Sequence, residues 1–324
     1  MSAPAPASPA TSAAGAEPLL VRLPNWVGDV CMALPALRAL EAAGFAPVLA
    51  GKGWAADLLA GHDWPLVKLP AGTRAGARAL REAHTPRRGL LLTNSIGSAL
   101  ALRLAGVSAL GHRNEGRAFL LGRALARVDG LHEVEVFWRL AAATAEWLGC
   151  VPLPPAPPAS LGLRLADTHR HAARDALARA GLADGARYAV VAPLAAGTTG
   201  GASKAWPAFG ELDRALRDAG LATVCCPGPG EDAAARAAVP GAIVLPGLGL
   251  GAYAAVCTGA RVTVANDSGP MHLAAALDAP VLGVFGPGDP RRTRPWGPRA
   301  HWVGGDGAWP STKAVVRLVS EVAA

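Results

Sequence analysis

The sequence predicts an α/β protein built from two doubly wound parallel-sheet domains. Short apolar runs alternate with helical patterns along the chain, which is typical of parallel strands joined by crossover helices. The chain has 324 residues, whereas a single hydrophobic core usually stops growing at roughly 250–300 residues. We therefore expect two domains of the same general kind.

The first predicted strand is Leu19–Leu23, and the loop PNWVGD follows it. A helix over about 30–43 comes next, because apolar side chains recur there at helical spacing and form one face. Gly44 is expected to end this helix, since Gly readily adopts the left-handed conformation found after helix C-termini. The apolar positions of the helix are Val30, Ala33, Leu34, Leu37 and Leu40.

A second alternating series follows a proline-rich segment at 151–160, whose prolines favour an extended linker. Its carboxyl-terminal strand ends are expected to bind the ligand of a doubly wound sheet. The predicted strands are Tyr188–Ala192, Ala222–Cys226, Ile243–Leu245, Val262–Ala265 and Val281–Phe285. The predicted helices are Pro207–Ala219, Glu231–Ala238, Leu250–Thr258, Pro270–Leu277 and Ser311–Val322.

These elements divide the chain into a first domain at 19–155 and a second at 156–324, with the last helix packing back across the linker. Residues 1–18 consist almost entirely of Ala, Pro and Ser, which predicts a disordered extension. This extension has neither the basic start nor the apolar block of a secretory signal. Five cysteines without CxxC spacing indicate a reducing compartment. We expect a cytoplasmic protein.

The net charge of +7 favours anionic partners such as phosphates or an acidic membrane surface. Nucleic acid is not expected, because lysine-rich tracts, zinc-finger spacing and aromatic RNA-binding signatures are missing from the sequence. No apolar run reaches the roughly 18 residues of a transmembrane segment. The scattered histidines give no metal-binding motif. Any membrane attachment is therefore expected to be peripheral.

Asp29 is the first candidate catalytic residue. It lies where the loop after the first strand meets the following helix, so its carboxylate could cap the helix. The alternative is a general base for an attacking hydroxyl at the mouth of a cleft. Gly28 beside it would allow a substrate to approach the backbone closely. Both interpretations of Asp29 stay open at this point.

A glycine-rich loop at 192–207, APLAAGTTGGASKAWP, is the second candidate segment. Thr198 and Thr199 supply hydroxyls, and Lys204 adds a mobile positive charge, which together suit a phosphate. The loop is not a Walker A motif, because Lys204 is preceded by Ser and followed by Ala. The alternative is an ordinary surface loop with a solvated lysine.

The segment ANDSGPMHLAAAL at 265–277 is the third candidate segment for the active site. Pro270 falls in the first turn of the predicted helix, where its missing N–H costs nothing. Ser268 and Gly269 would then offer N–H groups to an anion at the helix N-terminus, with His272 one turn further on the same side. The alternative assigns Asp267 to helix capping and His272 to an ordinary buried histidine.

The weaker candidates are Glu231 and a basic patch in the first half. Glu231 follows a strand in GPGED, which lacks the third glycine of a dinucleotide fingerprint. The patch suits a phosphorylated acceptor, although such patches are most often solvated faces. Its members are His112, Arg113, Arg117, Arg123 and Arg127.

Together these segments resemble glycosyltransferase family 9, the ADP-heptose:lipopolysaccharide heptosyltransferases, and most of all the second heptosyltransferases of the inner core. The resemblance covers the chain from about Leu19. It rests on five motifs in order, PNWVGDVCMALPALRAL, TNSIGSALALRLAG, GHRNEGRAFLL, ASKAWPAFGELDRAL and NDSGPMHLAAALDAPVLGVFGP. One departure is Ala205, where the family commonly has Arg between Lys and Trp-Pro.

The resemblance implies a GT-B fold, in which two Rossmann-like domains face each other across a cleft. It also implies inverting heptose transfer from ADP-heptose to the lipid A–core acceptor at the inner membrane, with neither metal nor cofactor. Asp29 matches the family's catalytic base, and Lys204 matches the lysine that contacts the donor diphosphate. The other matched donor positions are Thr198, Thr199, Glu231, Asp267, Ser268, Gly269 and His272. Acceptor contacts are expected from Asn25, Arg113 and Arg117.

Other functions remain open at this stage. A nicotinamide oxidoreductase would require a complete GxGxxG motif, which is missing. A two-domain solute-binding protein would require an export signal. A family 9 transferase with another nucleotide sugar or acceptor, or a nucleotide-sugar epimerase or hydrolase of the same fold, shares the donor site and is the harder alternative to exclude.

Overall fold

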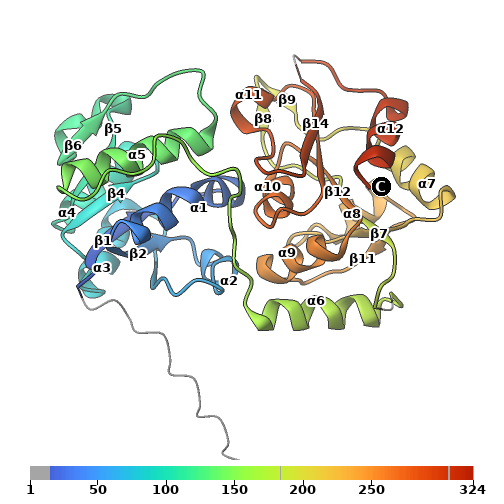
Figure 1. Ribbon diagram of the computed structural model, residues 1–324, viewed down its shortest axis with the longest axis horizontal. Coiled ribbons are helices and arrows are strands. Elements are labelled where there is room, and N and C mark those ends of the chain that lie inside the picture. The colour runs from blue at the N-terminus through green and yellow to red at the C-terminus, as the bar shows by residue number, and fades with distance from the viewer. Residues whose placement is uncertain (1–14, 183, 306, 324) are drawn as a thin grey trace, which may run out of the picture.

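The computed structural model describes residues 15–182, 184–305 and 307–323. Each half of the chain forms a six-stranded parallel sheet with helices on both faces, and the two halves lie side by side (Figure 1). Residues 1–14 of the predicted extension lie outside the described residues. Its last two residues, Glu17 and Pro18, already belong to the first strand.

The first sheet has the strand order β3-β2-β1-β4-β5-β6, which is the order of a dinucleotide-binding fold. Successive residues of β1 point to opposite faces, so Leu19 packs beneath α1 and α5 while Leu20 packs beneath α3 and α4. The strands are β1 (Glu17–Arg22), β2 (Phe45–Gly51), β3 (Leu66–Lys68), β4 (Arg88–Leu91), β5 (Ser108–His112) and β6 (Arg123–Leu125). The helices are α1 (Val27–Ala42), α2 (Ala55–Leu58), α3 (Thr73–Glu82), α4 (Ile96–Leu104), the 3-10 segment η1 (Asn114–Leu120) and α5 (Glu133–Trp147).

The second sheet repeats this topology with the order β11-β10-β7-β12-β13-β14. A short antiparallel hairpin, β8 (Thr198–Thr199) and β9 (Ala202–Ser203), interrupts the glycine-rich loop after β7. The sheet strands are β7 (Tyr188–Ala192), β10 (Ala222–Cys225), β11 (Ile243–Val244), β12 (Val262–Asn266), β13 (Val281–Phe285) and β14 (Ala300–Gly304). The helices are α6 (Asp167–Arg179), α7 (Phe209–Asp218), α8 (Asp232–Ala238), α9 (Leu250–Gly259), α10 (Gly269–Ala275), α11 (Pro290–Thr293) and α12 (Thr312–Val322).

The last helix, α12, does not pack back across the linker as the sequence analysis expected. Val315 and Val319 bury their side chains against the second sheet, beside α7. The amphipathic pattern of this helix is therefore satisfied within the second half of the chain.

Helices from both halves form the contact between them. The first turn of α1 faces α10, and α2 faces α9. The Asp57 carboxylate in α2 accepts the backbone N–H of Gly251 in the first turn of α9 at 3.0 Å. This pairing places a negative charge at the positive end of the α9 dipole. The apolar core under α1 is continuous with the core under α10.

In both sheets the strand order reverses beside the first strand, between β1 and β4 and between β7 and β12. Ligands of doubly wound sheets bind beyond the carboxyl ends of the strands at such a point. Asp29, Lys204 and Asp267 lie in the segments that follow three of these four strands, β1, β7 and β12. The fold thus brings the predicted site residues to the two reversal points.

The helices are short, and none in the described part of the chain is long and apolar enough to cross a bilayer. All five cysteines are free thiols, in agreement with the absence of CxxC spacing.

Candidate active site

Asp29 lies in the first turn of α1 and lines a cavity of about 370 Å³ at the carboxyl ends of β1 and β4. The residue at the N-cap is Trp26, which makes no side-chain capping bond. The capping interpretation of Asp29 is therefore wrong. Among the described residues, no hydrogen bond or ion pair engages the Asp29 carboxylate, which leaves it available to a ligand in the cavity.

Burial raises the pKa of Asp29 from its ordinary value of 3.8 to about 6. Loss of water around the carboxylate is the main cause, and the negative charge of Glu133 is the second. Lys204 lowers this pKa and Asp267 raises it, so charges of the second domain act on a carboxylate of the first. A carboxylate with a pKa near 6 is a stronger base than an ordinary Asp, while remaining ionised at neutral pH.

Lys204 follows the hairpin after β7 and pairs with Asp267, which follows β12. The Lys204 Nζ atom lies 2.5 Å from Asp267 Oδ2, and both side chains are mostly buried. Gly288 makes room for the carboxylate, because a β-carbon there would lie 2.7 Å from the same Oδ2 atom. Lys204 is therefore not the solvated surface lysine of the alternative interpretation. It is a fixed positive charge at the reversal point of the second sheet.

Asn266 is a residue whose positioning role the sequence analysis missed. Its buried side-chain oxygen accepts the backbone N–H of Trp206 at 2.9 Å. Its amide nitrogen donates to the carbonyl oxygens of Ala192 and Pro193, at 3.3 and 2.9 Å. One side chain at the end of β12 thus ties down both ends of the loop that carries Lys204. Such long-range bonds leave no local signal in the sequence.

The predicted hydroxyl donors and the start of α10 lie on the same side of the second sheet. Thr198 and Thr199 form β8, which Figure 1 shows on the side that faces the first half of the chain. Gly269 begins α10, and a β-carbon at this position would lie 3.3 Å from Cβ of Val27 in α1. The Ser268 hydroxyl donates to the Asn266 carbonyl oxygen at 3.2 Å. The helix start therefore faces the first turn of α1.

His272 is buried in the contact between the two halves. Its Cδ2 atom would lie 2.6 Å from a β-carbon at Gly28, so the ring packs directly on the first turn of α1. Burial lowers its pKa to about 4, and the ring is neutral at physiological pH. Its Nδ1 atom has no hydrogen-bond partner among the described residues. The approach that Gly28 permits is thus made by His272.

Glu231 and Asn25 are engaged locally. The Glu231 carboxylate accepts the backbone N–H of Gly228 at 2.9 Å in the exposed turn before α8. No hydrogen bond or ion pair between described residues connects it to Lys204 or Asp267. The Asn25 side chain accepts from Arg22 at 2.8 Å and lines the same cavity as Asp29. Asn25 therefore lines the same cavity as the candidate base, whereas Glu231 is not connected to the Lys204–Asp267 pair.

The predicted basic patch is wrong for Arg117, which is completely buried. Its guanidinium donates from Nε to the carbonyl oxygen of His112 at 2.8 Å and from Nη1 to that of Ser95 at 3.0 Å. Backbone carbonyls at the end of β5 and just before α4 thus take the place of solvent around this group. Arg113, by contrast, is exposed at the start of η1.

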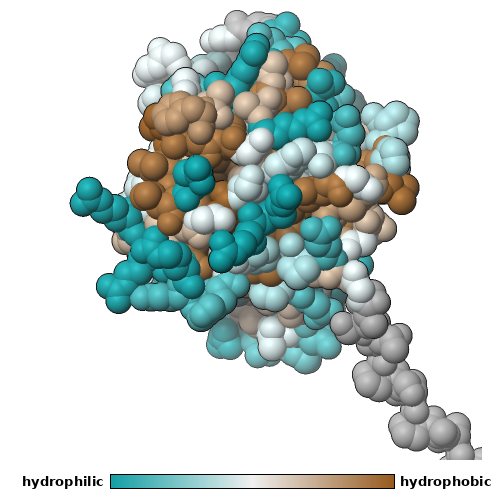
Figure 2. Space-filling model, turned by 90° about the vertical axis from the view of Figure 1, so that its left-hand side faces the viewer, coloured by the Kyte–Doolittle hydropathy of each residue, from teal (hydrophilic) through white to brown (hydrophobic). Residues whose placement is uncertain are grey.

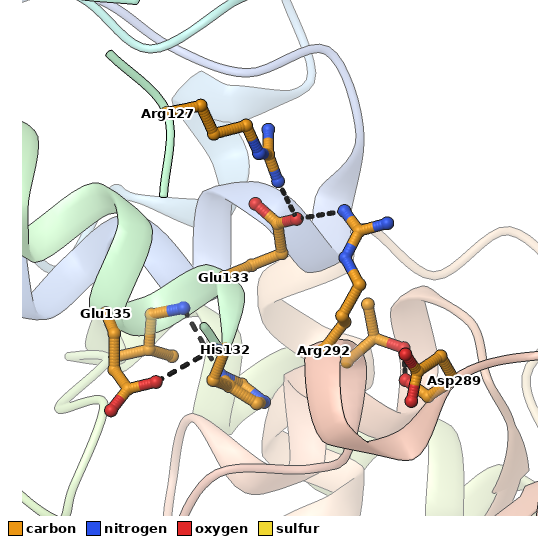
Figure 3. A network of polar contacts seen from close by, with 8 residues as sticks. Arg127, His132, Glu133, Glu135, Asp289 and Arg292 are labelled. Atoms are coloured by element: carbon orange, nitrogen blue, oxygen red, sulfur yellow. Dashed lines mark hydrogen bonds and ion pairs between the residues drawn. The ribbon is translucent and has the colours of Figure 1, made fainter. Parts of the chain in front are cut away.

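A charge cluster that spans both halves was also missed as a unit (Figure 3). Glu133, in the first turn of α5, pairs with Arg127 Nη2 at 2.5 Å and with Arg292 of α11. The Nε2 atom of the adjacent His132 lies 2.9 Å from the carbonyl oxygen of Arg294. An acidic residue in a first helical turn suggests only dipole stabilisation from sequence. Arg292, which pairs with Glu133 from the second half, lies 159 positions away in the chain.

The cluster lines the cavity that contains Asp29. The cavity is walled mainly by the first half of the chain, while Arg292 and Thr293 close it from the second. Three charged side chains, Arg127, Glu133 and Arg292, therefore line the cavity together with the candidate base, and Arg292 comes from the opposite domain. Across the described ranges, no three His, Cys, Asp or Glu side chains are grouped so as to hold a metal ion.

Solved structures with a similar fold include two E. coli heptosyltransferases and a family 9 glycosyltransferase. The structure of E. coli ADP-heptose lps heptosyltransferase II matches with a TM-score of 0.77 and 24% identity over 94% of this chain and 98% of that one. E. coli heptosyltransferase WaaC with ADP matches with a TM-score of 0.73 and 24% identity over 94% and 99%. A family 9 glycosyltransferase from Veillonella parvula matches with a TM-score of 0.78 and 18% identity over 95% and 97%. The fold is thus GT-B, as expected.

Sequence similarity supports the same family. Lipopolysaccharide heptosyltransferase 1 of Pseudomonas aeruginosa is 47% identical over 70 residues, a match that spans 22% of this chain and 20% of that protein. The model of glycosyltransferase family 9 (heptosyltransferase) matches residues 74–318. This match covers well over half of the chain, which therefore belongs to glycosyltransferase family 9, the heptosyltransferase family.

Proposed function

We propose that this protein transfers heptose from ADP-heptose to a hydroxyl of the lipopolysaccharide inner core, with inversion and without a metal ion. The observation that carries the proposal is the position of Asp29, whose pKa responds to Lys204 and Asp267 across the cleft. A base of the first domain thus lies within electrostatic reach of a lysine of the second, and residues of both domains line its cavity. Residues 19–155 would hold the acceptor, and residues 156–324 the donor.

In the proposed reaction an acceptor hydroxyl oxygen forms a bond to the anomeric carbon from the face opposite the diphosphate. Its proton passes to the Asp29 carboxylate, which is ionised at neutral pH. The bond between the anomeric carbon and the diphosphate oxygen breaks, and ADP leaves. The transition state resembles an oxocarbenium ion, as in other glycosyl transfers.

Negative charge grows on the departing diphosphate, and Lys204 is the cation best placed to stabilise it. Its ammonium pairs with the Asp267 carboxylate. A bound diphosphate would share that cation, with N–H groups at Ser268 and Gly269 and hydroxyls of Thr198 and Thr199 as further donors. A fixed lysine can take the charge-stabilising role that a divalent metal has in other transferases.

The contact of Glu133 with Arg292 supports a reaction in a closed cleft. It joins the acceptor-side helix α5 to the donor-side helix α11 at the wall of the cavity. Excluding water strengthens the electrostatic contacts inside and prevents hydrolysis of the donor. The acceptor is expected in the inner membrane, so we propose that the protein works at its cytoplasmic face as a peripheral protein.

Product analysis tests the proposal and separates it from its alternatives. Incubation with ADP-heptose and lipid A that carries inner-core sugars should increase the mass of the lipid by one heptose. The D29N variant, which keeps the shape of the side chain without its basicity, should form this product about 10²- to 10⁴-fold more slowly. A free heptose or an isomerised nucleotide sugar, with the lipid unchanged, would instead indicate a hydrolase or an epimerase. If transfer occurred only from another nucleotide sugar, the protein would still be a family 9 transferase, but its donor would not be ADP-heptose.

A further inference from the structure

An apolar ridge lies on the outer surface of the first domain, away from its core. Ile96, Leu100 and Leu104 follow one another at intervals of four along α4, so they share one face of the helix. They are 45%, 37% and 47% exposed. Phe119, in the adjoining segment η1, is 76% exposed. We call these four residues the α4 ridge.

The packing of α4 on the sheet does not require the four residues of the α4 ridge, which remain exposed. The core positions of α4 are Ala99, Ala101 and Leu102, which are buried against the sheet. Phe119 follows a turn in which Glu115 and Gly116 have positive φ angles of 54° and 69°, an unusual conformation for Glu. Contiguous apolar surface of this kind usually marks a binding face.

Arginines border the ridge. Arg103 belongs to α4 itself, and Arg81 of the neighbouring α3 donates to the carbonyl oxygen of Leu104 at 3.0 Å. The segment formed by α3, α4 and the start of η1 carries five exposed arginines but two glutamates, Glu82 and Glu115, so its exposed charged side chains are mainly positive. The arginines are Arg74, Arg78, Arg81, Arg103 and Arg113. Figure 2 shows this side of the molecule, with apolar surface beside projecting hydrophilic side chains.

We propose that the α4 ridge is the surface by which the protein docks on an anionic lipid bilayer, the apolar side chains entering the interface and the arginines binding headgroup phosphates. Apolar side chains flanked by cations are the pattern of interfacial membrane binding. A second copy of the chain is the less favoured partner, because a two-fold interface through the ridge would bring the arginines of both copies together.

The location of the ridge suits the proposed function, on which this inference rests. Ile96 lies two residues beyond Asn94, which lines the cavity with Asp29. The ridge therefore begins at the rim of the proposed acceptor site. An acceptor sugar could enter the cavity while its lipid anchor stays in the bilayer.

Co-sedimentation of the full chain with vesicles tests the proposal without measuring catalysis. The protein should bind vesicles of phosphatidylethanolamine and phosphatidylglycerol, and bind phosphatidylcholine vesicles far less. The double variant L100S/F119S should bind the anionic vesicles about tenfold more weakly or worse. The matched control V151S, at a residue 74% exposed in the linker, should bind like the unmodified protein.

A charge reversal gives an independent measurement. R103E should weaken binding to anionic vesicles several-fold. R179E changes an arginine at the equivalent position, the last turn of α6, and should have no such effect. The proposal is overturned if L100S/F119S or R103E binds as well as the unmodified protein, or if the control variants lose as much. It is also overturned if L100S/F119S only converts a dimer into a monomer in analytical ultracentrifugation.

Turnover of a delipidated, water-soluble core oligosaccharide separates this inference from the proposed function. The L100S/F119S variant should keep its kcat/KM on that acceptor and lose activity on acceptor embedded in vesicles. Vesicle binding that depends on the ridge, without heptose transfer to either acceptor, would contradict the proposed function and leave the docking surface intact.

Discussion

His272 and Gly28 are in direct contact across the two halves of the chain, with the imidazole Cδ2 atom where a side chain at position 28 would begin. The contact brings α10 and α1 together at their first turns, next to Asp29 and Lys204. The distance between these helices therefore sets how closely the candidate base approaches the donor site. Gly28 is the residue that permits the present distance.

The G28A substitution should push α1 away from α10, because the new β-carbon would lie 2.6 Å from His272 Cδ2. We expect kcat/KM to fall about 10- to 100-fold, since small misplacements of reacting groups are costly. The matched control is G76A in α3, where the nearest atom to a new β-carbon is 3.9 Å away. Kinetics and thermal unfolding of both variants measure the effect. If G28A/H272A regains activity, His272 has a packing role. If it stays inactive although its fold is intact, His272 contacts the donor.

Asp29 should determine the acidic limb of the pH–rate profile. Activity requires the ionised carboxylate, so kcat/KM should fall about tenfold per pH unit below a midpoint near 6. The D29N variant should lose activity by a factor of about 10² to 10⁴ and lack this limb. A D29N variant with substantial activity and an unchanged profile would show that another group is the base.

The same substitution should stabilise the protein at neutral pH. The pKa of Asp29 is raised on folding from 3.8 to about 6, so the folded state holds its proton more tightly than the unfolded state. The contribution to stability is full below pH 3.8 and is lost as the pH rises through about 6. The free energy of unfolding of D29N at pH 7 should therefore exceed that of the unmodified protein, by at most about 3 kcal/mol. Urea unfolding at pH 4 and pH 7 measures it. If D29N were destabilised equally at pH 4 and pH 7, burial would not be the cause of a raised pKa of Asp29.

Glu133 raises the pKa of Asp29 through its negative charge, after the larger effect of burial. In E133Q that charge is gone, ionised Asp29 is favoured, and the acidic limb should move to lower pH. Loss of the ion pair with Arg292 should also raise KM, because that pair joins α5 to α11 at the wall of the cavity. The matched control is E135Q, two residues along, whose carboxylate accepts the His132 backbone N–H at 2.8 Å. E135Q should reduce stability and leave the limb in place. If the acidic limbs of E133Q and E135Q have the same midpoint, Glu133 does not raise the pKa of Asp29.

Lys204 should be required for turnover more than for folding. K204A removes the cation opposite the leaving diphosphate, so we expect kcat to fall about 10²- to 10³-fold. The unpaired, buried Asp267 should lower the free energy of unfolding by about 1–3 kcal/mol. K313A, at an exposed lysine in α12, should change neither quantity. Chelator should leave the activity of the unmodified protein intact, whereas a strict requirement for added divalent metal would contradict the role given to Lys204.

The architecture could be predicted from sequence because each strand and helix carries a strong local pattern. The strands Tyr188–Ala192 and Val281–Phe285 have the predicted bounds, and Pro270 falls in the first turn of its helix as expected. Differences occur where the local pattern is weak. The helix predicted from Val30 begins at Val27, and a hairpin forms at 198–203 in a stretch of glycines and hydroxyl residues that gives no strand signal.

The surroundings of the site residues could not be predicted in the same way. Arg117 looks like any arginine of a basic segment, and only the folded chain brings the carbonyl of Ser95 to its guanidinium. The contact of Glu133 with Arg292 likewise depends on how two domains meet. Local patterns report on what a residue does within its own helix or strand. They do not report on partners that arrive from elsewhere in the chain.

Among the residues that the structure describes, the backbone passes once between the two sheets, through the proline-rich stretch after α5, because α12 remains with the second sheet. A single covalent tether allows one half to swing on the other, and contacts between the halves, such as Asp57 with α9, His272 with Gly28 and Glu133 with Arg292, oppose that swing. Cutting the tether would leave two pieces with nothing but these surfaces to keep them in register. The spacing of base and leaving group is thus governed by adhesion between faces, and it would respond to pressure, cosolvent and crowding as an interface between separate proteins does.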